Sequence, residues 1–155
     1  MKRAWRIIRR KRLQDAFTGE GARIGGGRWN HVGILVVYVS ETLSLAALEL
    51  FVHFTRNDLK LSKSLVAIPV DIPDSLRILE VSVSNLNPDW RMSPPSNSTK
   101  DIGTKWVQKG TTSILRVPSA LIPDEHNLML NPKHADFMKI KIGKPQPFAL
   151  DERMW

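Results

Sequence analysis

The sequence predicts an α+β fold, a compact single domain of short strands with a few helices that spans residues 1–155. The length of 155 residues suits one domain, and a 42% share of hydrophobic residues is enough for a real core. Short runs of β-branched and apolar residues recur along the chain, whereas few stretches have the period of a substantial helix. The chain has no internal repeat, so one domain is expected.

The N-terminal part of the chain predicts two strands separated by a glycine-rich loop. Arg3–Ile8 has the pattern of a short strand at the edge of a basic run, and Lys11–Phe17 predicts a helical turn. Thr18–Gly27 holds five glycines in ten residues and is expected to be a loop. Val32–Val39 is β-branched and apolar, which predicts a buried strand.

The next segment predicts a helix that is apolar on most of its surface. Ser40 or Thr42 suits the N-cap, and Glu41 is expected in the first turn, where a negative charge is favourable. One carboxylate, Glu49, stands among leucines and alanines. The apolar residues that recur on one face are Leu43, Ala46, Ala47, Leu50, Phe51 and Phe54. We expect this helix to be buried on two sides.

The middle of the chain predicts three more strands and a second helix. Ser64–Pro69, Leu76–Val81 and Thr111–Pro118 read as strands. Pro88–Asp101 is rich in proline, serine and asparagine, so it is expected to be an exposed loop. Thr104–Gln108 predicts part of a helix.

The C-terminal part predicts a loop through Asn127, a helical turn at His134–Phe137 and a late strand at Met138–Gly143, where apolar and basic residues alternate. The tail Lys144–Trp155 contains two prolines and is expected to be loosely held, with Phe148 and Trp155 available for packing.

The net charge of +8 is unevenly distributed, because Lys2–Arg12 contains most of the excess. Such a run fits an acidic partner or nucleic acid, or it is simply a solvated edge. A nucleic-acid-binding module would bind DNA in a salt-dependent way and would not turn over a small substrate. Both interpretations of the basic run remain open.

Composition excludes several kinds of site. The chain has no cysteine, and its four histidines are scattered, so we expect no disulfide and no metal site. The hydrophobic stretch Val32–Phe54 is long enough to suggest a membrane span, but it is interrupted by Ser40, Glu41 and Thr42. No secretory signal precedes it, so a cytoplasmic protein without a membrane partner is expected.

Two charged residues suggest a site that handles a nucleotide. Arg28 follows Gly25–Gly27, where backbone can approach a ligand closely, and a guanidinium suits a phosphate or carboxylate. Glu49 lies in an apolar helix, and a buried charge usually has a partner or a task. The alternatives are a surface arginine after a flexible turn and a carboxylate that serves only structure.

Five short motifs in order resemble one protein family, the RES domain, which is named for its Arg, Glu and Ser residues. The resemblance extends from about Trp5 to Ile142. The motifs are Gly25–Asn30, Val36–Tyr38, Leu45–Glu49, Val117–Ala120 and Asn127–Pro132.

The resemblance implies an ADP-ribosyltransferase-like fold and a role as toxin in a bacterial toxin–antitoxin pair. It implies NAD+ as the substrate, with no cofactor, and cleavage of the nicotinamide–ribose bond. The ADP-ribose would pass to water, phosphate or a protein. The implied partner is an Xre-like helix-turn-helix antitoxin that blocks the active site, and DNA would be contacted only through that complex.

The resemblance also implies the site residues. Arg28, Tyr38, Glu49 and Ser119 occupy the positions of the family set, and Gly27 adds a backbone contact to NAD+. We expect Arg28 to bind the pyrophosphate, Tyr38 to contact nicotinamide or ribose, and Glu49 to favour the positive charge that develops on ribose. Ser119 is expected to donate a hydrogen bond to phosphate or to the nicotinamide amide, not to act as a nucleophile.

Other polar residues lie near these motifs. Arg6 is an ambiguous match to a basic residue that many family members carry near the N-terminal strand. Asn30, Asn127 and Asn131 are expected to shape loops. A transferase that modifies a protein target would use the same NAD+-binding residues, so it remains an alternative.

Overall fold

A mixed eight-stranded sheet forms the frame of the computed structural model, which describes residues 1–154, apart from the side chain of Leu59. The sheet order is β4-β5-β6-β2-β1-β3-β7, and β8 also pairs with β3. The strands are β1 Lys2–Arg9, β2 Val37–Ser40, β3 Leu65–Ile72, β4 Ile78–Glu80, β5 Ile114–Pro118, β6 His126–Leu130, β7 Lys141–Ile142 and β8 Gln146–Phe148.

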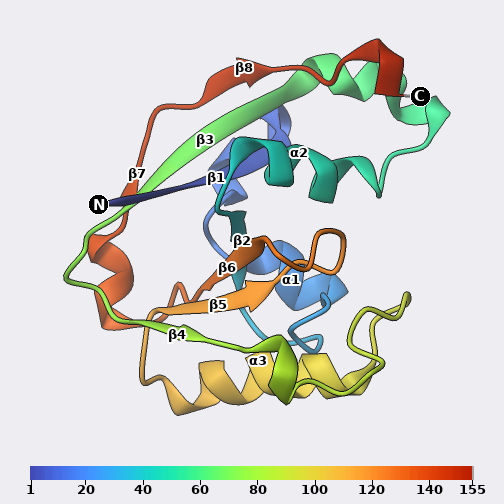
Figure 1. The fold of residues 1–155 in the computed structure, drawn as a ribbon. Coiled ribbons are helices and arrows are strands. Elements are labelled where there is room, and N and C mark those ends of the chain that lie inside the picture. The colour runs from blue at the N-terminus through green and yellow to red at the C-terminus, as the bar shows by residue number, and fades with distance from the viewer. Residues whose placement is uncertain (155) are drawn as a thin grey trace.

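Three α-helices and five 3₁₀ helices surround the sheet. In Figure 1, α2 lies beside β1, whereas α3 runs along the opposite end of the molecule beside β4 and β5. The helices are α1 Glu20–Gly25, α2 Leu43–Phe51, α3 Asn97–Lys109, η1 Arg10–Asp15, η2 Arg56–Ser64, η3 Val83–Asn85, η4 Ala135–Lys139 and η5 Glu152–Met154. The prediction of an α+β fold is confirmed.

The sheet is divided between β1 and β2. These strands pair at a single register position, Trp5 with Ser40, and then run in different directions (Figure 1). By contrast, β1 pairs with β3 along its whole length, from Lys2 with Ile72 to Arg9 with Leu65. The sheet therefore has two halves that diverge in direction where β1 meets β2, and we call this divergence of the two strands the wedge.

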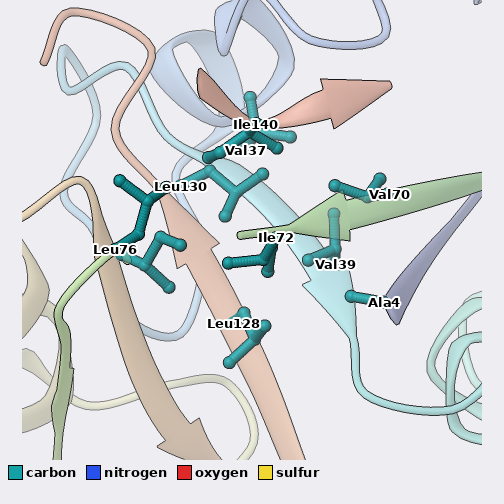
Figure 2. Packing of buried hydrophobic residues seen from close by; sticks show 10 residues of the cluster. Ala4, Val37, Val39, Val70, Ile72, Leu76, Leu128, Leu130 and Ile140 are labelled. Atoms are coloured by element: carbon teal, nitrogen blue, oxygen red, sulfur yellow. The ribbon is translucent and has the colours of Figure 1, made fainter. Parts of the chain in front are cut away.

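The main core joins the two half-sheets. Figure 2 shows side chains from β1, β2, β3 and β6 that point toward one another. The fully buried members of this core include Val37, Val70, Leu128 and Leu130. Because packed interiors tolerate little loss of volume, truncating a leucine here costs about 2–5 kcal/mol of stability. This core sets the angle between the halves and hence the width of the wedge.

A second core holds α3 against the glycine-rich turn. Trp29, Trp90, Trp106 and Met129 are buried together on the face of β5 and β6 that α3 covers. Gly103 permits the contact, because a Cβ at this position would lie 1.8 Å from the carbonyl oxygen of Trp29. The turn that carries Arg28 therefore rests directly on a helix.

Two elements predicted in the N-terminal part of the chain have different bounds in the structure. The predicted strand Val32–Val39 begins only at Val37, because the Asn30 side chain donates to the carbonyls of His31 and Ile34 and holds this segment in a turn. The predicted loop Thr18–Gly27 contains α1, in which Glu20 and Arg23 form an ion pair one turn apart.

The expectations for later segments also need correction. The predicted loop Pro88–Asp101 ends before Asn97, where α3 begins, and the last two residues of the predicted loop through Asn127 already belong to strand β6. The predicted loosely held tail pairs with β3 through β8, and Leu150 is buried. The expected packing of Trp155 lies outside the described residues. Within the described part of the chain, no helix has the length and apolarity needed to cross a membrane.

Candidate active site

Glu49 lies at the centre of a hydrogen-bond network that joins three elements. Its Oε1 atom accepts a bond of 2.8 Å from Ser119 Oγ, just after β5, and one of 2.7 Å from Asn127 Nδ2 at the start of β6. The helix that carries Glu49 begins at Thr42, whose side chain accepts a bond from the Leu45 amide. Both bonds go to one oxygen, so Oε2 is left for another partner.

Ser119 is fully buried, and its hydroxyl is completely engaged. Its oxygen accepts bonds of 3.1 and 3.2 Å from the amides of Leu121 and Ile122, and its only proton goes to Glu49. A hydroxyl has one hydrogen to donate. The expected bond from Ser119 to substrate therefore has no donor in this arrangement, and the residue orients the carboxylate.

Asn127 is a site residue that the sequence did not indicate. Its Oδ1 accepts a bond of 2.6 Å from Ser40 Oγ, which directs the amide nitrogen toward Glu49. Asn127 and Ser40 are register partners on β6 and β2, so the contact depends on strand pairing. The expectation of a loop-shaping role for Asn127 is wrong. The signal that was available is the apolar run Leu128–Leu130, which predicts a short buried strand that Asn127 directly precedes.

Arg28 lies in a tight turn and is held by a neighbouring loop. Backbone bonds of 3.1 and 3.4 Å between Gly27 and Asn30 close the turn. The Arg28 Nη1 atom donates to the carbonyls of Trp90 at 2.9 Å and Met92 at 2.8 Å. These carbonyls fix the plane of the guanidinium, while its Nε and Nη2 atoms make no hydrogen bond within the described residues.

The charge environment of Arg28 links it to Glu49. Burial lowers the pKa of Arg28, the Glu49 carboxylate acts in the opposite direction, and the nearby Arg91 lowers the pKa further. An arginine remains charged despite such a shift. Arg28 and Glu49 are thus a cation and an anion within electrostatic reach, with no ion pair between them.

Tyr38 is bound inside the protein through its hydroxyl. The hydroxyl donates to Asn30 Oδ1 at 2.6 Å and accepts from the Trp29 amide at 3.3 Å, and burial raises its pKa strongly. Gly27 packs on this group, since a Cβ there would lie 2.9 Å from the Tyr38 oxygen. The ring, and not the hydroxyl, is therefore the part of Tyr38 that remains for a substrate.

The glycine loop does not offer the backbone donors that were expected of it. The Gly26 amide donates to Ala22 O at 2.8 Å, and the Gly27 amide donates to Asn30 O at 3.1 Å. Both N–H groups are thus already used. Gly27 serves the site by allowing close packing against Tyr38 and Asn30 rather than by binding an anion.

Arg6 is a half-buried cation on β1 that reaches toward β2. Its Nη1 donates to Tyr38 O at 2.8 Å, its Nε is buried without a hydrogen bond, and its guanidinium carbon lies 6.0 Å from the centre of the Phe17 ring. Burial lowers its pKa to about 10. A buried charge without a carboxylate partner is unfavourable, so this arginine suits an incoming anion.

The site therefore combines one oriented carboxylate with Arg28, and Arg6 adjoins it through the backbone carbonyl of Tyr38. Among residues 1–154, no group of three histidine, aspartate or glutamate side chains is arranged to hold a metal ion. The expected absence of a metal stays a prediction. The arrangement is chemically suited to a ligand with negative groups at one end and a centre that becomes positive near Glu49.

Comparison with known proteins identifies the family. The RES domain model matches residues 3–151. The chain belongs to the RES domain family. This confirms the resemblance drawn from the five sequence motifs.

Curated members of the RES family match over nearly their whole lengths. The Prs ADP-ribosylating toxin of Sphingobium sp. (strain YBL2) is 39% identical, over 97% of this chain and 94% of its own. A protein named Toxin Res from Yersinia enterocolitica is 37% identical, over 97% of each chain. Another Toxin Res, from Photorhabdus laumondii, is 38% identical over 97% of this chain and 95% of its own. These three relatives are thus all named as toxins.

A solved structure supports the fold. The chain resembles the toxin–antitoxin complex MbcT–MbcA of M. tuberculosis with a TM-score of 0.76 and 18% identity, over 96% of this chain and 84% of that chain. At this identity the likeness concerns the fold alone. It agrees with the compact α+β architecture and the curled sheet.

Proposed function

We propose that this RES protein consumes NAD+ by breaking the bond between nicotinamide and ribose. The observation that carries the proposal is the orientation of Glu49 by Ser119 and Asn127, with Arg28 within its electrostatic reach. The family and the relative named as an ADP-ribosylating toxin support it. A toxin of this kind would act by depleting NAD+.

The chemistry requires stabilisation of positive charge and little acid catalysis. As the bond breaks, its electron pair goes to the nicotinamide nitrogen, which leaves as a neutral group, and ribose gains oxocarbenium character. The Glu49 carboxylate favours this charge electrostatically. Its free Oε2 suits a ribose hydroxyl, while Oε1 stays bonded to Ser119 and Asn127.

The two arginines provide the complementary anion site. NAD+ carries a pyrophosphate, and guanidinium groups bind phosphate oxygens through charge-assisted hydrogen bonds. Arg28 has free Nε and Nη2 donors, and the half-buried Arg6 lacks a carboxylate partner. Binding of the pyrophosphate would supply the counter-charge that both residues lack.

The acceptor of the ADP-ribose has three candidates: water, phosphate and a protein side chain. Water or phosphate would give hydrolysis or phosphorolysis, in which an oxygen bonds to the ribose carbon and loses its proton. Transfer to a protein side chain is the alternative, and the Sphingobium relative named Prs ADP-ribosylating toxin favours it. An antitoxin partner of Xre-like type is part of the same proposal, because a cell must restrain such an enzyme.

A direct experiment follows nicotinamide release from NAD+ by the purified protein. Parallel reactions contain water alone, added phosphate, or a cell extract with labelled NAD+, so that the acceptor is identified. A chelator in each reaction tests the expected independence of metal. Nicotinamide release in any of them supports the proposal, and the absence of release in all of them refutes it.

A further inference from the structure

Strand pairing brings two basic segments of the chain to one end of the molecule. We call residues 9–12 and 56–63 together the basic end. Arg9 closes β1 and pairs with Leu65, the first residue of β3, so η1 leaves the sheet where η2 enters it. In Figure 1, η2 is the green helix at the top, at the upper end of β3. Arg9 is also among the charges that lower the pKa of Asp58, after the hydrogen bonds from Thr55.

The positive charges of the basic end are uncompensated. Residues 9–15 and 56–64 contain seven lysines and arginines but two carboxylates, Asp15 and Asp58. The Asp58 carboxylate is occupied by the backbone and hydroxyl of Thr55. Within the described residues, none of the seven cations has an ion pair, whereas Arg3, Arg23 and Arg116 elsewhere are paired.

The helix type aligns two of these cations in a row. In a 3₁₀ helix, side chains three residues apart lie on the same side. Lys60 and Lys63 have this spacing in η2, whereas Arg10, Lys11 and Arg12 are consecutive in the first turn of η1. Arg10, Lys11 and Arg12 are all exposed. Two neighbouring segments thus present successive cations to solvent.

We propose that the basic end binds the phosphodiester backbone of nucleic acid, at a surface separate from the Glu49 site. Protein–protein interfaces centre on apolar and aromatic side chains. Among the side chains that the structure describes, no exposed large hydrophobic residue lies in the basic end, because those residues occur elsewhere, for example at Ile24, Val32 and Met138. Successive cations without an apolar centre suit phosphates, which are read by charge and spacing.

Two acidic residues border the basic end, but they do not neutralise its positive charge. The C-terminal turn brings Asp151 and Glu152 to a hollow that Lys63 also lines. The Asp151 carboxylate already binds Arg153. None of the cations of the basic end takes part in the hydrogen bonds of Glu49, Arg28 or Arg6.

The test measures fluorescence anisotropy of labelled duplex DNA, duplex RNA and poly-glutamate across a salt series. The variant Arg10→Gln/Lys11→Gln/Arg12→Gln is compared with a control of equal net charge, Lys105→Gln/Lys109→Gln/Lys144→Gln, whose positions are also exposed. A second variant, Lys60→Gln/Lys63→Gln, removes charge from the other segment. Circular dichroism and thermal melting are measured for every variant to show that each is folded.

The wild type and the control should bind duplex nucleic acid with a steep salt dependence. In the basic-end triple variant, the slope of log K against log salt should be smaller in magnitude by about 2 to 3, because each phosphate contact adds about 0.9 to it. This variant should also bind the duplex at least about tenfold more weakly. The relative affinity for DNA and RNA then identifies the natural duplex. The proposal is overturned by equal losses in the basic-end and control variants, by no binding, or by poly-glutamate binding as tightly as the duplexes. The proposed NAD+ chemistry can fail without changing these outcomes, because the binding assay contains no NAD+.

Discussion

The position of the Glu49 carboxylate depends on two hydrogen bonds to the same oxygen. Sequence reasoning identified Glu49 and Arg28 from their chemical character, because a lone carboxylate in an apolar helix and an arginine after glycines are locally unusual. It did not identify Asn127, and it gave Ser119 a different partner. Those contacts join residues that are 70 and 78 positions apart, and no local pattern encodes such a pairing.

Removal of the Asn127 amide should slow the chemical step. Asn127→Ala leaves Glu49 Oε1 with one hydrogen bond and frees the carboxylate to rotate. A hydrogen bond to a charged group contributes about 1.5–3 kcal/mol, so kcat should fall about 10- to 100-fold while KM for NAD+ changes little. Steady-state kinetics of nicotinamide release measure both. Asn85→Ala, on exposed η3, is the control and should match the wild type. A rise in KM with unchanged kcat would show that Asn127 binds substrate instead.

Replacement of Arg6 should separate binding from stability. Arg6→Met removes a half-buried cation that has no ion pair within the described residues. It also removes the one hydrogen bond that Arg6 donates to the Tyr38 carbonyl oxygen. Exchange of a buried charge for an apolar side chain is often neutral or stabilising, so the free protein should melt at or above the wild-type temperature. KM for NAD+ should rise at least about tenfold, the effect of one charged hydrogen bond. Thermal melts with and without NAD+ measure both effects. An unchanged KM would remove Arg6 from the NAD+ site.

At the scale of elements, α3 supports the turn that carries Arg28. Gly103→Ala would place a methyl group 1.8 Å from Trp29 O, so the helix must move away. We expect a loss of stability of about 1–3 kcal/mol, as for overpacked cores, together with a raised KM. Gly21→Ala in α1 is the control, because its Cβ would meet nothing within 4 Å, and it should stabilise by up to about 1 kcal/mol. Urea unfolding measures the free energy of unfolding of the two variants. Equal stability of the two variants would contradict this packing role.

A charge cluster also links β1 to β5 through Glu41, which directly follows β2. Glu41 was expected in the first turn of α2, but it lies before the Thr42 cap and binds Lys2 and Arg116, with Arg116 Nε 2.9 Å from Glu41 Oε1. Burial raises the pKa of Glu41, but the hydrogen bonds from Arg116 and Lys2 outweigh it and leave the pKa below its usual range. The expectation that Glu41 lies in the first turn of α2 and favours the helix dipole is therefore wrong. Its carboxylate instead links Lys2 of β1 to Arg116 of β5.

The charge cluster predicts a defined pH dependence of stability. Because the folded pKa of Glu41 is depressed, its contribution is fully present above the unfolded pKa of about 4.3 and is lost as pH falls through the folded value. Glu41→Gln should therefore be less stable than wild type near neutral pH, and the difference should shrink below about pH 4. Urea unfolding at several pH values measures it. A difference that grows in acid would contradict the assigned sign.

At the scale of the whole molecule, the sequence indicated the family and the α+β class, but not the division of the sheet. The five motifs were local and could be recognised in order. The divergence of β1 and β2 depends on a single register position, Trp5 with Ser40, and on a core assembled from five strands. Hydrophobic pattern alone does not specify where a sheet stops pairing, so the place of Arg6 could not be derived.

The rate of nicotinamide release by Glu49→Gln tests the central claim most directly. Glutamine keeps an oxygen that can accept the bonds from Ser119 and Asn127, so the fold should persist while the negative charge is lost. We predict that kcat falls at least about 100-fold and that KM stays within a few-fold, since the charge acts mainly in the transition state. Glu152→Gln, exposed on η5, is the matched control and should retain full activity. Turnover by Glu49→Gln at the wild-type rate, in a protein with the wild-type melting temperature, would contradict the proposed role of the carboxylate.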